Sequence, residues 1–302
     1  MKRVLSIVGA LLLGLIALGP GLRPVSAQIE QIQPAFSNTE IGTYGLPTVE
    51  ANGSASGFTF TATEANAGKL HVILNSEVGV AVYLDFMQVP EGLDEVTATE
   101  QALLMARDDV PSEGWTYGGG SFAFGGDSVE FIVDLTPGEW HLAASYMPDT
   151  ENGGEEEIMT LTPFTVHEAT PVAAGDLQAD VALELQDVAF EISNATIPTG
   201  PQIWHVTNTG EQPRQMVLFK TPRAFTSEDF ASFFADMDTG TPSAEFMSMV
   251  WVAYTAVASP GYSTWLELDL EPGTYTATSW VIDPETQMPA LLLGMVESFT
   301  VE

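Results

Sequence analysis

Few side chains in this sequence are suited to catalysis, although carboxylates are abundant. The chain of 302 residues has no Cys and four His, against 41 Asp and Glu residues. Nucleophilic catalysis needs an activated side chain, and the sequence offers neither a Cys nor a Gly-x-Ser-x-Gly turn. No two His residues have the spacing of a metal-binding pair. This pattern predicts that the chain is not an enzyme.

Among the many carboxylates, one stretch has a composition that suits cation binding. Asp149, Glu151, Glu155, Glu156 and Glu157 surround a Gly-Gly pair. Calcium prefers oxygen ligands, and a flexible acidic loop can supply them. The spacing does not match an EF-hand loop, whose twelfth position falls on a Thr. The stretch is therefore either a calcium-binding loop or a solvated hairpin tip. Other pairs of acids are too common here to indicate acid/base catalysis.

The histidines are better explained by packing than by chemistry. His71 and His205 lie in apolar segments that are predicted to be strands. A buried imidazole in a strand is usually hydrogen-bonded to a neighbour. We therefore expect these two rings to be structural.

The elements around these residues form a pattern that occurs twice. Residues 134–166 align without a gap on residues 269–301, which superposes two Pro-Gly turns and two Phe-Thr-Val segments. Each copy reads as a strand, a type II turn at Pro-Gly, a second strand, an irregular loop and a last strand. The sequence therefore predicts two copies of one unit.

The second copy resembles the cupredoxins, the family of blue-copper β-sandwiches. Its residues 270–275, LEPGTY, resemble the L-x-P-G-x-Y of that family, and Phe299-Thr300-Val301 resembles the closing F-x-V. Upstream, residues 198–210 resemble the strand that precedes the first copper ligand. The resemblance covers residues 180–302 well and residues 46–166 more loosely. It implies an all-β chain of two tandem cupredoxin-like Greek-key β-sandwiches, each with a short helix in a connecting loop.

The resemblance does not extend to the copper ligands. A blue-copper site uses two His, a Cys thiolate and a weak axial Met. Carried over residue by residue, these positions fall in the second copy on Arg214, Ser279, Ala290 and Met295. In the first copy they fall on Ala81, Ala144, Glu155 and Thr160. Because the chain has no Cys, a thiolate–copper centre is chemically impossible. We expect the fold without the redox activity, and no cofactor.

Two further expectations concern the region of the lost ligands in the second copy. The loop over residues 288–295 is apolar, so that it either docks on a partner or folds down to fill the space of the metal. Arg214 is one of few basic residues, and a charged hydrogen bond to Asp283 or Glu285 is expected to replace metal ligation.

The chain divides into a leader, an arm and two domains. Residues 1–27 have the basic start, apolar run and small-residue cleavage site of a secretory signal, with the cut after Ala27; an uncleaved anchor is the alternative. Residues 28–45 are predicted to be an arm that is loosely ordered or docked on the first domain. The domains are residues 46–167 and 180–302, joined by a linker over residues 168–179.

Each domain is predicted to carry one helix. Thr97 and Glu100 form a capping box for a helix from residue 98 to about residue 107. The second helix starts at residues 226–229, and apolar residues at helical spacing predict the face that packs on the sandwich. These residues are Phe230, Phe233, Phe234 and Met237.

The charge of the chain limits its partners. The formal net charge is −33, and removal of the leader, which holds three of the eight basic residues and no acid, leaves −36. Such a field repels nucleic acid and anionic membranes and attracts cations or basic proteins. We therefore expect an exported, non-catalytic binding or structural module with a protein or cation as partner. The alternatives are a protein that binds copper or calcium through His and carboxylate ligands, and an extracellular hydrolase.

Overall fold

Alternation of apolar and polar residues accounts for the strands. In β1 (Thr48–Ser54) every second residue is buried, and β10 (Val181–Leu185) shows the same alternation. This is the period of a strand with one face on a core. The computed structural model describes residues 33–302 apart from 78–80, 148–156, 171, 173–174, 176, 195 and 240–242.

The elements fall on either side of residue 170. Those before it are η3 (Ile41–Thr43), β1, β2 (Gly57–Phe60), β3 (Glu64–Asn66), β4 (Gly68–Ser76), β5 (Ala81–Gln88), α2 (Glu95–Asp108), β6 (Thr116–Phe124), β7 (Ser128–Leu135), β8 (Gly138–Met147) and β9 (Ile158–His167). Those after it are β10, β11 (Phe190–Ile192), β12 (Gly200–Asn208), β13 (Arg214–Thr221), α3 (Ser227–Thr239), η4 (Phe246–Ser248), β14 (Val250–Ala258), β15 (Ser263–Leu270), β16 (Gly273–Thr278), α4 (Ala290–Leu293) and β17 (Val296–Val301). We call these two groups the first and second halves.

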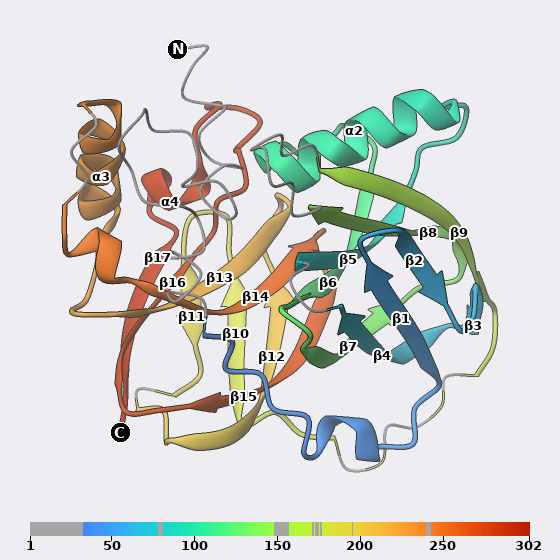
Figure 1. Ribbon diagram of the computed structural model, residues 1–302, viewed down its shortest axis with the longest axis horizontal. Coiled ribbons are helices and arrows are strands. Elements are labelled where there is room, and N and C mark those ends of the chain that lie inside the picture. The colour runs from blue at the N-terminus through green and yellow to red at the C-terminus, as the bar shows by residue number, and fades with distance from the viewer. Residues whose placement is uncertain are drawn as a thin grey trace.

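The strands form two sheets, and each sheet runs through both halves (Figure 1). One has eight strands in the order β11-β10-β12-β15-β7-β4-β1-β2, and the other has nine in the order β17-β16-β13-β14-β6-β5-β8-β9-β3. The prediction of an all-β chain is confirmed. The eight-stranded and nine-stranded sheets are called sheet B and sheet A below.

The two halves contribute corresponding strands to each sheet in the same order, counted from the two opposite edges toward the seam. With β1, β2, β4 and β7 matched to β10, β11, β12 and β15, sheet B reads identically in both directions. With β5, β6, β8 and β9 matched to β13, β14, β16 and β17, so does sheet A up to the additional strand β3. The pairing types agree as well, because β1–β4 and β10–β12 are both parallel.

The seam between the halves is short, and the arm lengthens it. Strands β14 and β6 pair only at Ala258 and Gly118, and β15 and β7 pair over three residues. Beyond these pairs, the N–H groups of Gln33 and Ala35 donate to carbonyls of β14, and that of Ser37 donates to β15. The arm therefore docks on both halves: residues 33–37 bond to β14 and β15 of the second half, whereas Asn38 bonds to β7 and η3 contacts β7 of the first half. Docking on the first half alone, as predicted, describes only the later part of the arm. Free strand edges at the seam, which the sequence does not show, provide the docking site.

A buried carboxylate fixes the next residues of the arm. The side chain of Glu267 is almost fully buried on β15. Its Oε2 accepts hydrogen bonds from the backbone N–H groups of Glu40 (2.8 Å) and Ile41 (3.0 Å), and its Oε1 accepts from the N–H and hydroxyl of Thr39. Burial opposes ionisation of Glu267, yet these hydrogen bonds outweigh it and lower the pKa of the carboxyl.

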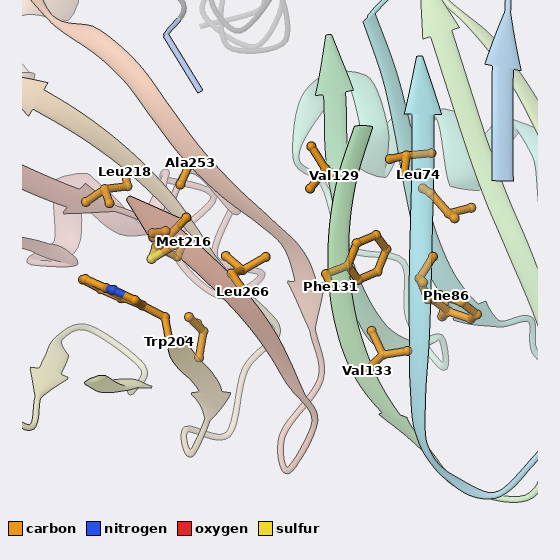
Figure 2. Close-up of a cluster of buried hydrophobic side chains, with 14 of the residues drawn as sticks. Leu74, Phe86, Val129, Phe131, Val133, Trp204, Met216, Leu218, Ala253 and Leu266 are labelled. Atoms are coloured by element: carbon orange, nitrogen blue, oxygen red, sulfur yellow. The ribbon is translucent and has the colours of Figure 1, made fainter. Parts of the chain in front are cut away.

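The main core lies between the sheets and has contributions from both halves. Figure 2 shows Leu74, Phe86 and Phe131 on strands of the first half, and Trp204 and Leu266 on strands of the second half. The outer face of sheet A is covered as well. Helix α2 packs over the first half and helix α3 over the second, and both lie on the same side of the molecule (Figure 1).

The helices differ from the sequence prediction mainly at the start of α2. The helix begins at Glu95, because the side chain of Asp94 accepts a hydrogen bond from Thr97 N–H and caps it. The predicted cap at Thr97 is therefore wrong by three residues. Helix α3 does begin at Ser227, and its own residues Phe230 and Phe233 are buried on the face that packs on the sheet. Within the residues that the structure describes, no helix has the length and apolar character needed to cross a membrane.

Candidate functional site

Arg214 is the first residue of β13, and its side chain is fully buried. Its Nη2 donates to Asp283 Oδ2 at 3.3 Å, and its Nε and Nη1 donate to the backbone carbonyls of Asp187 and Pro213 at 2.9 and 2.8 Å. Burial lowers the pKa of Arg214, and the charge of Asp283 opposes this. Of the two carboxylates that the sequence offers as partners, Asp283 is the one in contact, whereas Glu285 is exposed.

The other three positions that the resemblance assigns to copper lie next to this pair. Ser279 Oγ accepts a hydrogen bond from the backbone N–H of Gln215 at 3.4 Å, and the Ser279 N–H donates to the carbonyl of Met295 at 3.3 Å. Ala290 and Met295 are fully buried in the main core. The fold thus brings all four positions, Arg214 included, to one place.

These residues do not fit a copper ion. A guanidinium has no lone pair to give and is positively charged, and Ala290 has no donor atom at all. The Ser279 hydroxyl is a hard ligand where copper needs soft sulfur, so that only the thioether of Met295 suits the metal. The apolar loop has folded down instead, since Ala290, Leu291 and Met295 are buried, although Met288 stays 40% exposed.

The acidic loop can be placed only in part. Asp149, Glu151, Glu155 and Glu156 lie outside the described residues. Glu157, which directly precedes β9, is half-buried, and burial raises its pKa. Glu157 therefore faces the protein and is left out of any solvent-facing cation site. In the part of the chain that the structure describes, no group of three or more His, Asp or Glu side chains is arranged to hold a metal ion.

A second polar centre lies where α2 meets the second half. Asp109 follows α2 in a left-handed conformation (φ 53°), and its side chain is 3% exposed. Its Oδ1 accepts a hydrogen bond from Gln215 Nε2 at 3.0 Å, and its backbone carbonyl accepts one from Ile282 N–H at 2.8 Å. Its Oδ2 has no hydrogen-bond partner among the described residues. Asp109 thereby joins the first half to the second.

Asp85 lies on the same outer face of sheet A, in β5. Its neighbours Leu84 and Phe86 point into the main core, so Asp85 and Tyr83 point to the opposite face. Asp85 is 8% exposed, and its Oδ1 has no hydrogen-bond partner among the described residues. The ring of Tyr83 meets the edge of the Tyr254 ring with centroids 5.7 Å apart. We call Asp85, Asp109 and Glu157 the acid cluster.

The acid cluster favours protonated carboxyl groups. Burial raises the pKa of Asp85 to about 8, and the charges of Glu157 and Asp109 add to the shift. Burial raises the pKa of Asp109 to about 7, the hydrogen bond from Gln215 opposes this, and Asp108 and Glu157 raise it further. The Asp85 carboxyl therefore carries a proton at neutral pH. The cluster can hold and release protons within the physiological range.

Sequence reasoning missed the acid cluster. With 41 acidic residues, an individual Asp carries little information. A signal is present nonetheless, because Asp85 interrupts the apolar strand of residues 81–87. The residues two positions before and after it, which share its face of the strand, are Tyr83 and Met87. An acid on a solvent-facing side of a strand would have polar residues at those positions instead.

The histidines are held as expected. His71 Nε2 lies 2.7 Å from Glu130 Oε2, and its Nδ1 lies 3.2 Å from the Thr48 hydroxyl. His205 stacks on Trp265 at 3.9 Å between ring centroids, and burial lowers the pKa of His205 to about 4. Neither imidazole is free to ligate a metal without breaking these contacts.

Comparison with known proteins gives matches only among solved structures. No family profile and no curated protein sequence matches the chain. Auracyanin from Roseiflexus castenholzii is 21% identical over 40% of this chain and 94% of its own, with a TM-score of 0.28. The copper-containing nitrite reductase of Thermus scotoductus is 12% identical over 84% of this chain and 61% of its own, with a TM-score of 0.23. The blue copper oxidase of Nitrosomonas europaea is 15% identical over 81% and 78%, also with a TM-score of 0.23.

One prediction is corrected by this comparison. The sequence predicted that the chain is not an enzyme, and that prediction is contradicted because the similar structures include a nitrite reductase and a blue copper oxidase. The lack of a Cys and of a Gly-x-Ser-x-Gly turn argues only against nucleophilic catalysis of those kinds and does not exclude other catalytic mechanisms. Absence of catalysis is therefore not part of the function proposed below.

Proposed function

We propose that the chain is an exported binding protein whose ligand is a cation or the basic surface of another protein. The observation that carries this proposal is the state of the basic residues. Every Lys and Arg that the structure describes is paired with a carboxylate, at 2.8 to 3.3 Å. Because no described basic side chain is left to offset the remaining acids, the excess of carboxylates gives the protein a net negative field. Such a field speeds the encounter with cationic partners and repels anionic ones.

The scaffold of this binding protein is proposed to be two copies of a cupredoxin-like unit that no longer holds copper. The matching strand order of the halves supports the two copies. The buried Arg214–Asp283 pair supports the loss of copper, because it places a cationic side chain where the resemblance calls for a ligand. Export is proposed from the leader over residues 1–27 and its cleavage after Ala27.

The exposed acids at the start of α2 provide a first test. Glu91, Glu95 and Glu100 are exposed, with no described ion pair. Titration of the mature protein with an oligolysine peptide in a calorimeter should give saturable binding that weakens steeply with salt. Replacement of the three Glu by Gln should weaken binding several-fold, whereas replacement by Asp keeps the charge and should not. Absence of saturable binding at low salt, or binding insensitive to both salt and the Gln variant, overturns the proposal.

A calcium ion is the second candidate ligand, and it is favoured by the composition of the acidic loop. Asp149, Glu151, Glu155 and Glu156 supply carboxylate oxygens around a Gly-Gly pair. Calorimetry with calcium should show binding that is lost when these four residues become Asn and Gln. Magnesium serves as the matched control, because it demands a more rigid octahedral site. No heat and no shift of the melting temperature at millimolar calcium rule this ligand out.

A further inference from the structure

The outer face of sheet A is apolar at both ends and polar in the middle. Helix α2 covers the first half with an apolar cluster, and helix α3 covers the second half with an aromatic one. Between them lie Asp85 and Asp109, together with Gln215 of the second half. Two hydrogen bonds, both to Asp109, connect the end of α2 to the second half here. One comes from Gln215 Nε2 and the other from Ile282 N–H.

Apart from one arginine that is already paired, the titratable groups around these two acids are carboxyls and tyrosines. The titratable and charged groups that face them are Tyr83 on β5, Tyr117 on β6, Tyr254 on β14, Glu157 before β9, and Arg107 and Asp108 at the end of α2. Arg107 is already paired with Asp108 at 2.9 Å. Arg214, the nearest basic residue of β13, is paired with Asp283. No described cation is therefore left to neutralise Asp85 and Asp109.

The unpartnered atoms make the charged state costly. Asp85 Oδ1 and Asp109 Oδ2 are buried and receive no hydrogen bond from the described residues, and the hydroxyl of Tyr83 is likewise without a partner. An ionised carboxylate in such a place loses hydration without gaining a donor. Two ionised carboxylates on the same buried face also repel one another.

We propose that Asp85 and Asp109 form a proton-operated latch, which holds α2 to the second half while the acids are protonated and releases it when they ionise. The moving parts are the end of α2 and the segment around Ile282. Release breaks the hydrogen bonds to Asp109 and admits water to the centre of the outer face. The halves remain joined through the seam and the arm, so the latch alters one face of the molecule and not its whole fold.

The direction of the pH response follows from linkage. Asp85 and Asp109 have pKa values of about 8 and about 7 in the latched state, against an ordinary value of 3.8. Between these limits the latched state holds protons that the open state has released, so latching weakens as pH rises. Each such proton changes the opening equilibrium about tenfold per pH unit. The latch is therefore strongest at and below about pH 4, weakens as pH rises, and weakens no further above about pH 8.

Hydrogen exchange at a single amide tests the latch in the unmodified protein. The Ile282 N–H is protected by the carbonyl of Asp109. Its protection factor, corrected for the chemical exchange rate, should fall by about a hundredfold or more between about pH 6 and about pH 9. The Leu291 N–H is the internal control, because it donates to the backbone carbonyl of Ser279 at 2.8 Å, within the second half. It should lose much less protection than the Ile282 N–H. Equal changes at both amides, or none at Ile282, overturn the proposal.

Neutral variants give the second arm of the test. Asn mimics protonated Asp in shape and charge, so the Asp85→Asn, Asp109→Asn double variant should keep Ile282 protected at alkaline pH, with less than about a threefold change. Asp127→Asn, at an exposed position, should behave as the wild type. A double variant that keeps the wild-type pH response refutes the latch. If that variant does not fold, carboxyl carbon NMR of the wild type decides, since two Asp must titrate above pH 6.

Discussion

At the scale of the residue, Arg214, Glu267 and Asp85 are all buried in strands but differ in what surrounds their charge. Arg214 has a carboxylate and two carbonyls as acceptors. Glu267 accepts from two backbone N–H groups and from Thr39. Asp85 has an oxygen that accepts nothing from the described residues. Glu267 is therefore stabilised in the charged form and Asp85 in the neutral form, whereas the acceptors around Arg214 offset only part of the cost of burying its charge.

Replacing Arg214 by Met tests the buried pair. The change leaves Asp283 near the core without its cation, and breaking a buried pair costs about 3 kcal/mol or more of unfolding free energy. Urea unfolding of the variant should therefore show a clearly lower midpoint. Arg223→Met is the control, because Arg223 is exposed and pairs on the surface with Asp229 and Glu245, so its loss should leave the midpoint nearly unchanged. An Arg214 variant with the wild-type midpoint contradicts the role assigned to this pair.

Replacing Glu267 by Gln tests the anchor of the arm. Gln keeps an acceptor but loses the charge, so stability at neutral pH should fall by about 1 to 2 kcal/mol. The pKa of Glu267 is lowered below its ordinary value of 4.5, so the stabilisation is present above that value and is lost as pH falls through the folded-state pKa. Wild type and variant should therefore differ at pH 7, and the difference should shrink as pH falls below 4.5. A difference in urea midpoint that persists in acid counts against ionised Glu267 as the anchor.

At the scale of the element, the pairing of β5 with β6 decides where Asp85 points. The register shifts between Asp85 and Met87, and the opposite strand meets this irregularity with Gly120 at φ 156°. A Cβ at Gly120 would collide with the backbone carbonyl of Leu84. Gly120 thus lets β6 approach β5 closely beside Asp85, whose side chain points to the outer face of the sheet.

Gly120→Ala should therefore disturb this pairing. Because the collision is with backbone and the conformation is unfavourable for a side chain, the loss of unfolding free energy should reach at least about 3 kcal/mol. The matched control is Gly125→Ala, at φ 69° and with no atom within 4 Å of the added Cβ, which should cost only about 1 to 2 kcal/mol. If thermal melts give the two variants the same loss of stability, the close approach of β6 to β5 at Gly120 is refuted.

The elements also show how far the sequence predicts this protein. Local signals, such as the Pro-Gly turns and the helix start at residues 226–229, place β8, β16 and α3 correctly, because turn and helix-start signals act over a few residues. The docking of the arm and the acid cluster depend on contacts between distant segments. Neither the edge of β14 nor the meeting of Asp109 with Gln215 is visible in a local pattern. The Arg214–Asp283 pair was predictable because basic residues are few here.

At the scale of the whole molecule, continuity of both sheets couples the halves. The linker would permit independent domains, yet β6 pairs with β14 and β7 with β15. These pairings are short, and the arm adds hydrogen bonds to β14 and β15 while η3 contacts β7. The interface thus combines short sheet pairings, the arm with η3, the hydrogen bonds to Asp109 and the shared core. Each of these parts depends on the halves being folded.

This arrangement predicts a single unfolding transition. A calorimetric enthalpy equal to the van't Hoff enthalpy is the expected result for the mature chain. Deleting residues 28–40 removes the hydrogen bonds of Gln33, Ala35 and Ser37, and should split the transition in two, because these bonds extend the short sheet pairing between the halves. Deleting only residues 28–32, which precede the first of these bonds, is the control and should keep one transition. Two transitions in the full mature chain, or one in the longer deletion, would show that the arm does not couple the halves.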